Sequence, residues 1–410
     1  MKMLRYGATA AIVAGAAVFL GSVPAGAVEN GTVSNAAWVV SVGGTTPDGW
    51  AYCSGTALNE SWVLTAGHCP DIDDTVRYPT GINGQYGEYV AVDKVVESPN
   101  ADIQLVHLAT PHRLKAYPPI DLGYTPVAGD TGFNFGLGSP NGGEQRRLQS
   151  KVIGGGEDTV KGKAVVVADI DGANAGGDSG GPLVVNGKVV GVLSWNTIET
   201  DHSKQRYGFS NLRNAVAMIA GRTIGSIDFA DNRASIEVGN DFLTANDQLV
   251  AYVNGQYAGS VSGGSAYYSS RQENTARNTY TWSFAAAAGD SVKIARVAVG
   301  ANVDIANADI LTSTLAGKIM SITTSSGRPV LAVANSLVDW KHTVLWVNGA
   351  YVGEADNGSV YYLSSSRSGG ITRLMSDAPV PPGSTAELTL VPGKYPTPEG
   401  SETVYSAVVF

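Results

Sequence analysis

The second half of the chain contains an internal repeat, and this repeat restricts the possible folds more than any other feature. The segment VNGQYAG at 253–259 matches VNGAYVG at 347–353, an offset of 94 residues. The same offset aligns GSAYY at 264–268 with GSVYY at 358–362. Several ungapped matches at one offset indicate a duplicated structural unit. We therefore expect two tandem domains of about 90 residues each.

Each copy carries an Asn-Gly pair between residues that favour strands, at Asn254-Gly255 and Asn348-Gly349. Asn-Gly is the strongest short signal for a β-hairpin, because both central positions of a type I′ turn need positive φ. The spacing of the strand-like runs is typical of small β-sandwiches. We expect the two repeats to be immunoglobulin-like β-sandwich domains.

The region before the repeats also has the pattern of a β protein. Short apolar runs, such as 38–42 and 189–195, are separated by Gly, Asn, Asp and Pro. This pattern predicts an antiparallel β-barrel or sandwich. A helix is expected over 211–220, and the polar run 228–234 is a plausible linker.

These patterns predict a mainly β chain with several domains, as its length suggests. The expected order is a signal peptide at 1–27, a β domain at 28–225, a linker at 226–234, and sandwich repeats at 235–320 and 321–410.

The first residues have the features of an export signal. Lys2 and Arg5 precede the apolar run 8–20, and the small residues of 25–27 suit a signal peptidase. A membrane anchor is the alternative, but the run is short and rich in Ala and Gly. We expect a secreted, extracellular protein with no membrane anchor.

The net charge argues against nucleic-acid partners. Loss of Lys2 and Arg5 removes two positive charges and changes the formal net charge from −9 to −11. An acidic chain without a basic patch lacks the electrostatic attraction for nucleic acid or anionic lipid. We expect no cofactor and no metal.

The chain has two cysteines, Cys53 and Cys69. In an exported chain, an isolated pair this close in sequence is read as one disulfide bond. A metal site is the poorer alternative, because two thiolates need further ligands and His68 alone is near.

Three segments carry the residue types needed for nucleophilic chemistry. They are LTAGHC at 64–69, NADIQL at 100–105 and GDSGGPL at 177–183. In this order, and with a cysteine directly after the histidine, they resemble the chymotrypsin-like (trypsin superfamily) serine proteases over about 28–220. The resemblance implies a two-barrel protease domain that hydrolyses peptide bonds in protein or peptide substrates.

The resemblance also assigns roles. Ser179 is expected to be the nucleophile, because a hydroxyl attacks a carbonyl once a base removes its proton. His68 would be that base, and Asp102 would orient it and stabilise its charged form. The backbone N–H groups of Gly177 and Ser179 would form the oxyanion hole. The alternative for each isolated motif is an ordinary turn, or a homologue that has lost activity.

In this family Asp178 forms a buried ion pair with a new N-terminal amine. Val28, followed shortly by Gly31, resembles the mature N-terminus of the family. We expect removal of the signal peptide to free the Val28 amine directly. Cleavage of the signal peptide after Ala25 is the main alternative.

The resemblance places the primary specificity pocket around six residues. They are Ala173 at the base, Asn174 beside it, Ser194, Trp195 and Asn196 along one wall, and Gly208 on the other. Ala173 replaces the aspartate that trypsin-like enzymes use for basic side chains, so a neutral P1 residue is expected. Asp171 would enter the pocket only if the loop alignment shifts.

The leading hypothesis is a secreted serine endopeptidase whose repeats localise or space it. The alternative is an extracellular binding or adhesion protein, in which the repeats act and the protease domain is an inactive scaffold. The paired tyrosines at 267–268 and 361–362 could form a glycan- or protein-binding face, or they could be half-buried packing.

Overall fold

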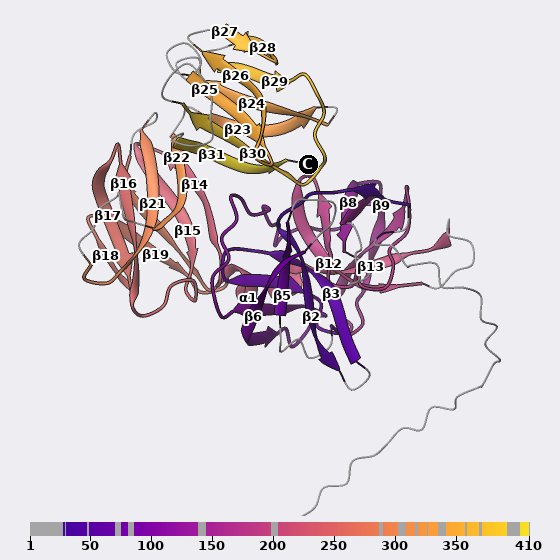
Figure 1. Cartoon of the computed structure of the whole chain (residues 1–410). Coiled ribbons are helices and arrows are strands. Elements are labelled where there is room, and N and C mark those ends of the chain that lie inside the picture. The colour runs from indigo at the N-terminus through magenta and orange to yellow at the C-terminus, as the bar shows by residue number, and fades with distance from the viewer. Residues whose placement is uncertain are drawn as a thin grey trace, which may run out of the picture.

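The computed structural model confirms a mainly β chain with several β domains (Figure 1). It describes residues 28, 30–46, 49–69, 75–80, 86–137, 145–197, 204–286, 290–301, 309–315, 319–325, 327–334, 342–356, 359–368, 371–391 and 402–409. The expected signal peptide, 1–27, lies outside these residues. Within the described part, no helix is long and apolar enough to cross a membrane.

Six strands form the first barrel, which closes in the order β2-β3-β4-β7-β6-β5. Its strands are β2 (Val39–Thr46), β3 (Gly49–Ala57), β4 (Trp62–Thr65), β5 (Thr75–Pro79), β6 (Tyr86–Glu97) and β7 (Gln104–Leu108). All four residues of β4 are buried, so this strand lies at the centre of the core. The disulfide Cys53–Cys69 links β3 to the segment after β4.

A second barrel follows along the chain. Its strands are β8 (Thr131–Gly136), β9 (Arg146–Glu157), β10 (Lys163–Asp169), β11 (Pro182–Val185), β12 (Lys188–Asn196) and β13 (Tyr207–Asn211). The pairing β8–β9 closes the ring, and the short β1 (Thr32–Val33) adds to β9. Aliphatic and aromatic side chains such as Val165, Leu183 and Phe209 fill its interior. The two-barrel fold is thus confirmed.

The helix expected over 211–220 forms in two parts. Asn211 caps the 3₁₀ helix η2 (Leu212–Ala215) by accepting a hydrogen bond from the Arg213 N–H at 3.0 Å. The α-helix α1 (Val216–Ala220) follows and buries Ile219 against the core. An asparagine cap of this kind satisfies one of the free N–H groups at a helix start.

The first repeat is a sandwich of two sheets. The four-stranded sheet has the order β14-β15-β20-β19 and the five-stranded sheet the order β18-β17-β16-β21-β22. The strands are β14 (Ile224–Ala230), β15 (Arg233–Gly239), β16 (Asp247–Val253), β17 (Gln256–Ser262), β18 (Ser265–Tyr267), β19 (Ser270–Asn274), β20 (Thr279–Ala285), β21 (Ser291–Ala298) and β22 (Asp309–Leu315). Residues of both sheets, such as Trp282 and Ile294, meet in one core.

The structure differs from the linker expected at 226–234. These residues belong to the hairpin β14–β15, whose second strand pairs with β20 inside the first sandwich. The polar residues Asp231 and Asn232 form its tight turn with positive φ. Polarity at this place therefore marks a hairpin turn and not a linker.

The second repeat has the same strand order, β23-β24-β29-β28 in one sheet and β27-β26-β25-β30-β31 in the other. The strands are β23 (Ile319–Ser325), β24 (Arg328–Ala334), β25 (His342–Val347), β26 (Ala350–Asp356), β27 (Ser359–Tyr361), β28 (Leu363–Ser368), β29 (Ile371–Ser376), β30 (Ser384–Leu390) and β31 (Glu402–Val409). The expected boundary at 320–321 falls inside β23, so the second sandwich begins slightly earlier.

Both Asn-Gly pairs form the hairpin turns that the sequence predicts. Asn254 and Gly255 have φ of 52° and 79°, and Asn348 and Gly349 have φ of 50° and 78°. Two successive positive φ values are the requirement of a type I′ turn. These turns join β16 to β17 and β25 to β26, which are paired neighbours in their sheets.

The repeats contact the two barrels through specific polar groups. Glu60, which is 6% exposed at its side chain, forms an ion pair with Arg296 of the first sandwich. The Trp38 indole N–H donates to the Gly383 carbonyl at 3.2 Å. Lys115 donates to Glu387 at 2.7 Å. Each sandwich is therefore bonded to the two-barrel domain as well as connected to it through the chain.

Candidate active site

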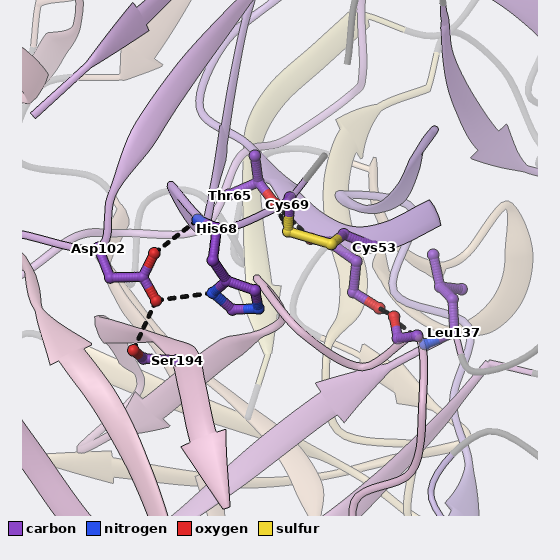
Figure 2. The surroundings of a disulfide bond; sticks show 9 residues. Cys53, Thr65, His68, Cys69, Asp102, Leu137 and Ser194 are labelled. Carbon is purple, nitrogen blue, oxygen red and sulfur yellow. Dashed lines mark hydrogen bonds and ion pairs between the residues drawn. A yellow bond between two sulfur atoms is a disulfide. The ribbon is translucent and has the colours of Figure 1, made fainter. Parts of the chain in front are cut away.

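His68 and Asp102 meet at the edge of the first barrel. His68 follows β4, and Asp102 precedes β7, the strand that pairs with β4. Nδ1 of His68 lies 2.7 Å from Oδ2 of Asp102, and Oδ1 of Asp102 accepts a hydrogen bond from the His68 backbone N–H at 2.7 Å (Figure 2). Because an ionised carboxylate only accepts, this contact favours the proton on Nδ1 and leaves Nε2 as the basic nitrogen.

Asp102 is 1% exposed, and its environment stabilises the ionised form. Burial alone raises the pKa of Asp102, but hydrogen bonds from His68 and Ser194, together with the charge on His68, outweigh burial and lower it. Ser194 donates to Oδ2 at 2.5 Å (Figure 2). A carboxylate so supplied with donors remains charged at neutral pH.

A second buried acid holds the Asp102 segment against the second barrel. Asp158 accepts the Asp102 backbone N–H at 2.9 Å and the Ser210 hydroxyl at 2.6 Å on one oxygen. Its other oxygen accepts the Gly162 N–H at 2.7 Å. Asp158 thereby bonds residues of both barrels and fixes the backbone that carries Asp102.

The Ser179 loop precedes β11 in the second barrel and is bonded to neighbouring strands. The Ser54 N–H donates to the Ser179 carbonyl at 2.8 Å, and the Ser54 hydroxyl donates to the Gly177 carbonyl at 2.9 Å. Gly180 N–H donates to the Leu193 carbonyl at 2.9 Å. Gly177 has φ of 96°, a conformation that residues with a side chain rarely adopt. Ser179 itself is partly exposed.

Val28 and Asp178 lie together in the interior. The Val28 main-chain nitrogen donates to Oδ2 of Asp178 at 3.2 Å, and both residues have no solvent exposure. The Ala175 N–H donates to the same oxygen at 2.8 Å. Gly136 packs directly on the Asp178 carboxylate, where a larger residue would collide. The structure therefore brings together the two residues expected to form the N-terminal ion pair.

The residues expected at the base of the specificity pocket are buried. Ala173 is 8% exposed and Asn174 is 9% exposed. The Asn174 N–H donates to the Tyr207 hydroxyl at 3.2 Å. Tyr207 is completely buried and lies opposite Asn196 in the β12–β13 ladder. Its phenol therefore joins the expected base to the expected wall, a contact that the sequence did not suggest.

The residues expected at the two walls lie on neighbouring strands. Gly208 pairs with Trp195 in the β12–β13 ladder, and the Trp195 indole occupies the space beside its α-carbon. The assignment of these residues to the walls of a specificity pocket stays a prediction. Ser194 turns its hydroxyl toward Asp102, as described above, while Trp195 donates from its indole to the Glu157 carbonyl at 2.7 Å.

Two acids lie at the end of β10, and they behave differently: Asp169 is its last residue, and Asp171 follows it. Asp171 is exposed and accepts the Gln149 N–H, so it points along β9. Asp169 accepts the Ser150 hydroxyl at 2.6 Å. Burial raises the pKa of Asp169 to about 6, although hydrogen bonds from donors that include Ser150 and Tyr207 act to lower it. Asp169 is therefore the acid that interacts with the Tyr207 phenol.

Ser54, Asp158 and Ser194 support the site, although no motif in the sequence indicated this role. Ser54 follows the disulfide Cys53, and Asp158 lies 56 residues beyond Asp102, so no local spacing links them to the motifs. For Ser194, the sequence showed only its position beside Trp195. Among the described residues, no group of three or more His, Cys, Asp and Glu side chains is arranged to hold a metal ion.

Comparison with known proteins agrees with the geometry. The trypsin family model matches residues 28–218. Human chymotrypsin-like elastase family member 1 is 33% identical over 182 residues, covering 35% of this chain and 69% of its own length. Trypsin of Saccharopolyspora erythraea is 30% identical over 176 residues, covering 37% and 78%. Among solved structures, mouse neuropsin matches 47% of this chain and 96% of its own with a TM-score of 0.39 and 20% identity. The chain therefore belongs to the trypsin family of serine proteases and is a serine endopeptidase.

Proposed function

We propose that this protein is an exported endopeptidase that cleaves peptide bonds through an acyl-enzyme on Ser179, with His68 as base and Asp102 as its partner. The observation that carries this proposal is the 2.7 Å contact between His68 Nδ1 and the buried Asp102 carboxylate. It orients the imidazole and leaves its other nitrogen available for the serine proton.

The reaction proceeds in two halves. His68 takes the Ser179 proton as the hydroxyl oxygen attacks the carbonyl carbon, and it then returns that proton to the leaving amine. In the second half, His68 takes a proton from water as the water oxygen attacks the acyl-enzyme, and return of that proton to Ser179 releases the second product. The backbone N–H groups of Gly177 and Ser179 stabilise the oxyanion, and the bonds from Ser54 hold that loop in place before substrate arrives.

The pocket is proposed to accept a neutral P1 side chain. Ala173 supplies no charge at the base, and the exposed Asp171 is bonded to the Gln149 backbone. Asp169 is hydrogen-bonded to Ser150, and its raised pKa lessens its negative charge in mildly acidic solution. A basic side chain would therefore find no carboxylate at the position of Ala173.

Export is proposed to activate the enzyme. Removal of residues 1–27 would convert the Val28 nitrogen into an ammonium group beside Asp178. A buried carboxylate without a charge partner is costly, so this pairing favours the ordered site. Support comes from the position of Val28, already within 3.2 Å of the carboxylate.

A fluorophosphonate probe tests the central proposal. The probe should label the mature protein at Ser179, and labelling should disappear in Ser179→Ala. A peptide-library profile should then show cleavage after neutral residues. If correctly processed, folded protein is not labelled, the chain is an inactive scaffold and its function lies in the repeats. The family membership makes this alternative the less favoured one.

A further inference from the structure

Each sandwich displays tyrosine rings to solvent at the same place. Tyr268 is 87% exposed and Tyr362 is 69% exposed, and each follows a tyrosine, Tyr267 or Tyr361, that is at least half exposed. Of the two interpretations open from the sequence, half-buried packing does not fit the exposures of Tyr268 and Tyr362. A large exposed apolar ring gains little stability from burial, so another reason for its presence is needed.

The rings are arranged identically in both copies. The Tyr257 and Tyr268 rings lie 6.1 Å apart between centroids at an interplanar angle of 88°. The Tyr351 and Tyr362 rings lie 6.1 Å apart at 84°. This edge-to-face geometry holds the outer ring in a defined orientation. We call these pairs the tyrosine sites of the first and second repeat.

The inner ring of each pair is anchored through its hydroxyl. Tyr257 donates to the Ser260 hydroxyl at 3.0 Å. At the equivalent place Tyr351 interacts with Glu354, and burial, with this carboxylate, raises the pKa of Tyr351 to about 12. Ser260 and Glu354 are related by the same offset of 94 residues. The anchor is thus retained although its chemistry differs between the copies.

The backbone at the outer ring is strained. Tyr268 has φ of 52° and Tyr362 has φ of 57°, in the left-handed region that aromatic residues rarely adopt. Glycine or asparagine would adopt this conformation at lower cost. Retention of an exposed tyrosine at a strained position in both copies indicates a function of the ring.

The tyrosine sites lie next to edge strands of the two sandwiches. They adjoin β18 and β27, the edge strands of the five-stranded sheets, and both edges face away from the two barrels (Figure 1). Serines are close to these tyrosines in the sequence, including Ser265, Ser269 and Ser359. In the first repeat the nearby Arg271 is paired with Glu273 and stacked on Tyr280, which leaves little net charge.

We propose that the tyrosine sites bind neutral polysaccharide chains, with Tyr268 and Tyr362 stacked on the apolar faces of pyranose rings. Serine hydroxyls would bond the sugar hydroxyls, and charge is not required. Each chain would carry two such sites, so a polymer that spans both gains avidity. The peptidase would then be concentrated on a polysaccharide surface.

A peptide ligand fits these sites less well. Strand addition needs a long exposed edge for main-chain pairing, but β18 and β27 are three residues long. A proline-rich peptide needs a groove between aromatic rings, whereas Tyr268 projects into solvent with 87% of its surface exposed. A projecting aromatic ring can instead stack on the flat apolar face of a sugar ring.

The test uses the full mature chain with Ser179→Ala, which prevents self-digestion. Depletion from solution is measured with insoluble cellulose, chitin, xylan and starch. We expect binding to at least one polymer, about tenfold weaker in Tyr268→Ala or Tyr362→Ala and weaker still in the double variant. Tyr89→Ala, which removes a ring 56% exposed on the protease domain, is the matched control and should bind normally.

Three results would overturn the proposal. One is no depletion by any of the four polymers, and another is depletion that the tyrosine substitutions leave unchanged. The third is binding of a proline-rich peptide that competes at these tyrosines in place of the polymers.

A second pair of variants separates binding from structure. Tyr268→Gly and Tyr362→Gly remove the ring and relieve the backbone strain. Each should weaken polysaccharide binding while the melting temperature stays the same or rises. A melting temperature that falls as far as in Tyr280→Ala, where the ring is buried, would show that the outer tyrosines are structural.

Discussion

The main-chain nitrogen of Val28 lies 3.2 Å from Oδ2 of Asp178, and both residues are fully buried, although 150 positions separate them in sequence. Asp178 directly precedes Ser179, so anything that moves its carboxylate also moves the loop of the nucleophile. In the proposed mature chain, which starts at Val28, the new terminus would be coupled to the active site through this buried carboxylate.

Extension of the terminus should inactivate the enzyme. A mature chain that begins at Gly26 instead of Val28 would place an amide where the ammonium should be, and Asp178 would lose its charge partner. Loss of one partner from a buried pair costs about 3–5 kcal/mol, so kcat/KM should fall at least 100-fold. N-terminal sequencing of secreted, active enzyme should give Val28 as the first residue. Full activity from a chain with another start would refute the coupling.

Ser194 should act as a positioning residue for Asp102. Ser194→Ala removes the 2.5 Å bond to Oδ2 and leaves the His68 contact intact. A hydrogen bond to a charged group contributes about 1.5–3 kcal/mol, so kcat should fall by about 10- to 150-fold with little change in KM. The pKa of Asp102 should rise toward its ordinary value, because one stabilising donor is lost. Ser194→Thr, which keeps the hydroxyl, should recover part of the lost kcat. A Ser194→Ala variant with a raised KM and an unchanged kcat would contradict this role.

The buried Glu60 should make the protease domain depend on the first sandwich. Its neighbours are Arg296 of that sandwich and Arg113, the latter at 3.7 Å. Arg296→Met should lower the free energy of unfolding by about 3 kcal/mol, because Glu60 stays buried with one weaker partner. Arg277→Met, at an ion pair whose two side chains are 37% and 39% exposed, should cost less than about 1 kcal/mol. The free energies of unfolding are measured by urea denaturation. Equal losses in the two variants would argue against a specific contact between Glu60 and Arg296.

Asp169 should make stability fall as pH rises. Its pKa is about 6 in the folded protein and about 3.9 in an unfolded chain, so the folded state holds the proton more tightly between these values. The free energy of unfolding should therefore decrease across that window, by up to about 3 kcal/mol from this residue. Asp169→Asn should stabilise the protein at pH 7.5 relative to wild type and have little effect at pH 4.5. Urea denaturation at both pH values measures the free energy of unfolding of the variant and of wild type. An equal gain in stability at both pH values would show that Asp169 does not have a raised pKa.

Local patterns predicted much of the fold because they act over a few residues. The Asn-Gly pairs required positive φ, and both turns have it. The offset of 94 residues predicted a repeated unit, and the two sandwiches share one strand order. The polar run at 228–234 was misread as a linker, because a hairpin turn and a linker have the same composition.

The site was predictable where residues adjoin a motif and unpredictable where partners come from distant strands. His68, Asp102 and Ser179 stood in recognisable segments, but Asp158 and its bond to the Asp102 backbone did not.

Residue types and short spacings were enough to predict the β class, the duplication and the disulfide partners, whereas the triad candidates came from the resemblance to a protease family. Tertiary structure alone decided that Ser194 donates to Asp102, that Tyr207 joins Asn174 to the β12–β13 ladder, and that the tyrosines of both repeats face solvent. These contacts depend on the closure of barrels and the packing of sheets. Side chains far apart in sequence meet only after that packing has fixed which face of each strand is buried.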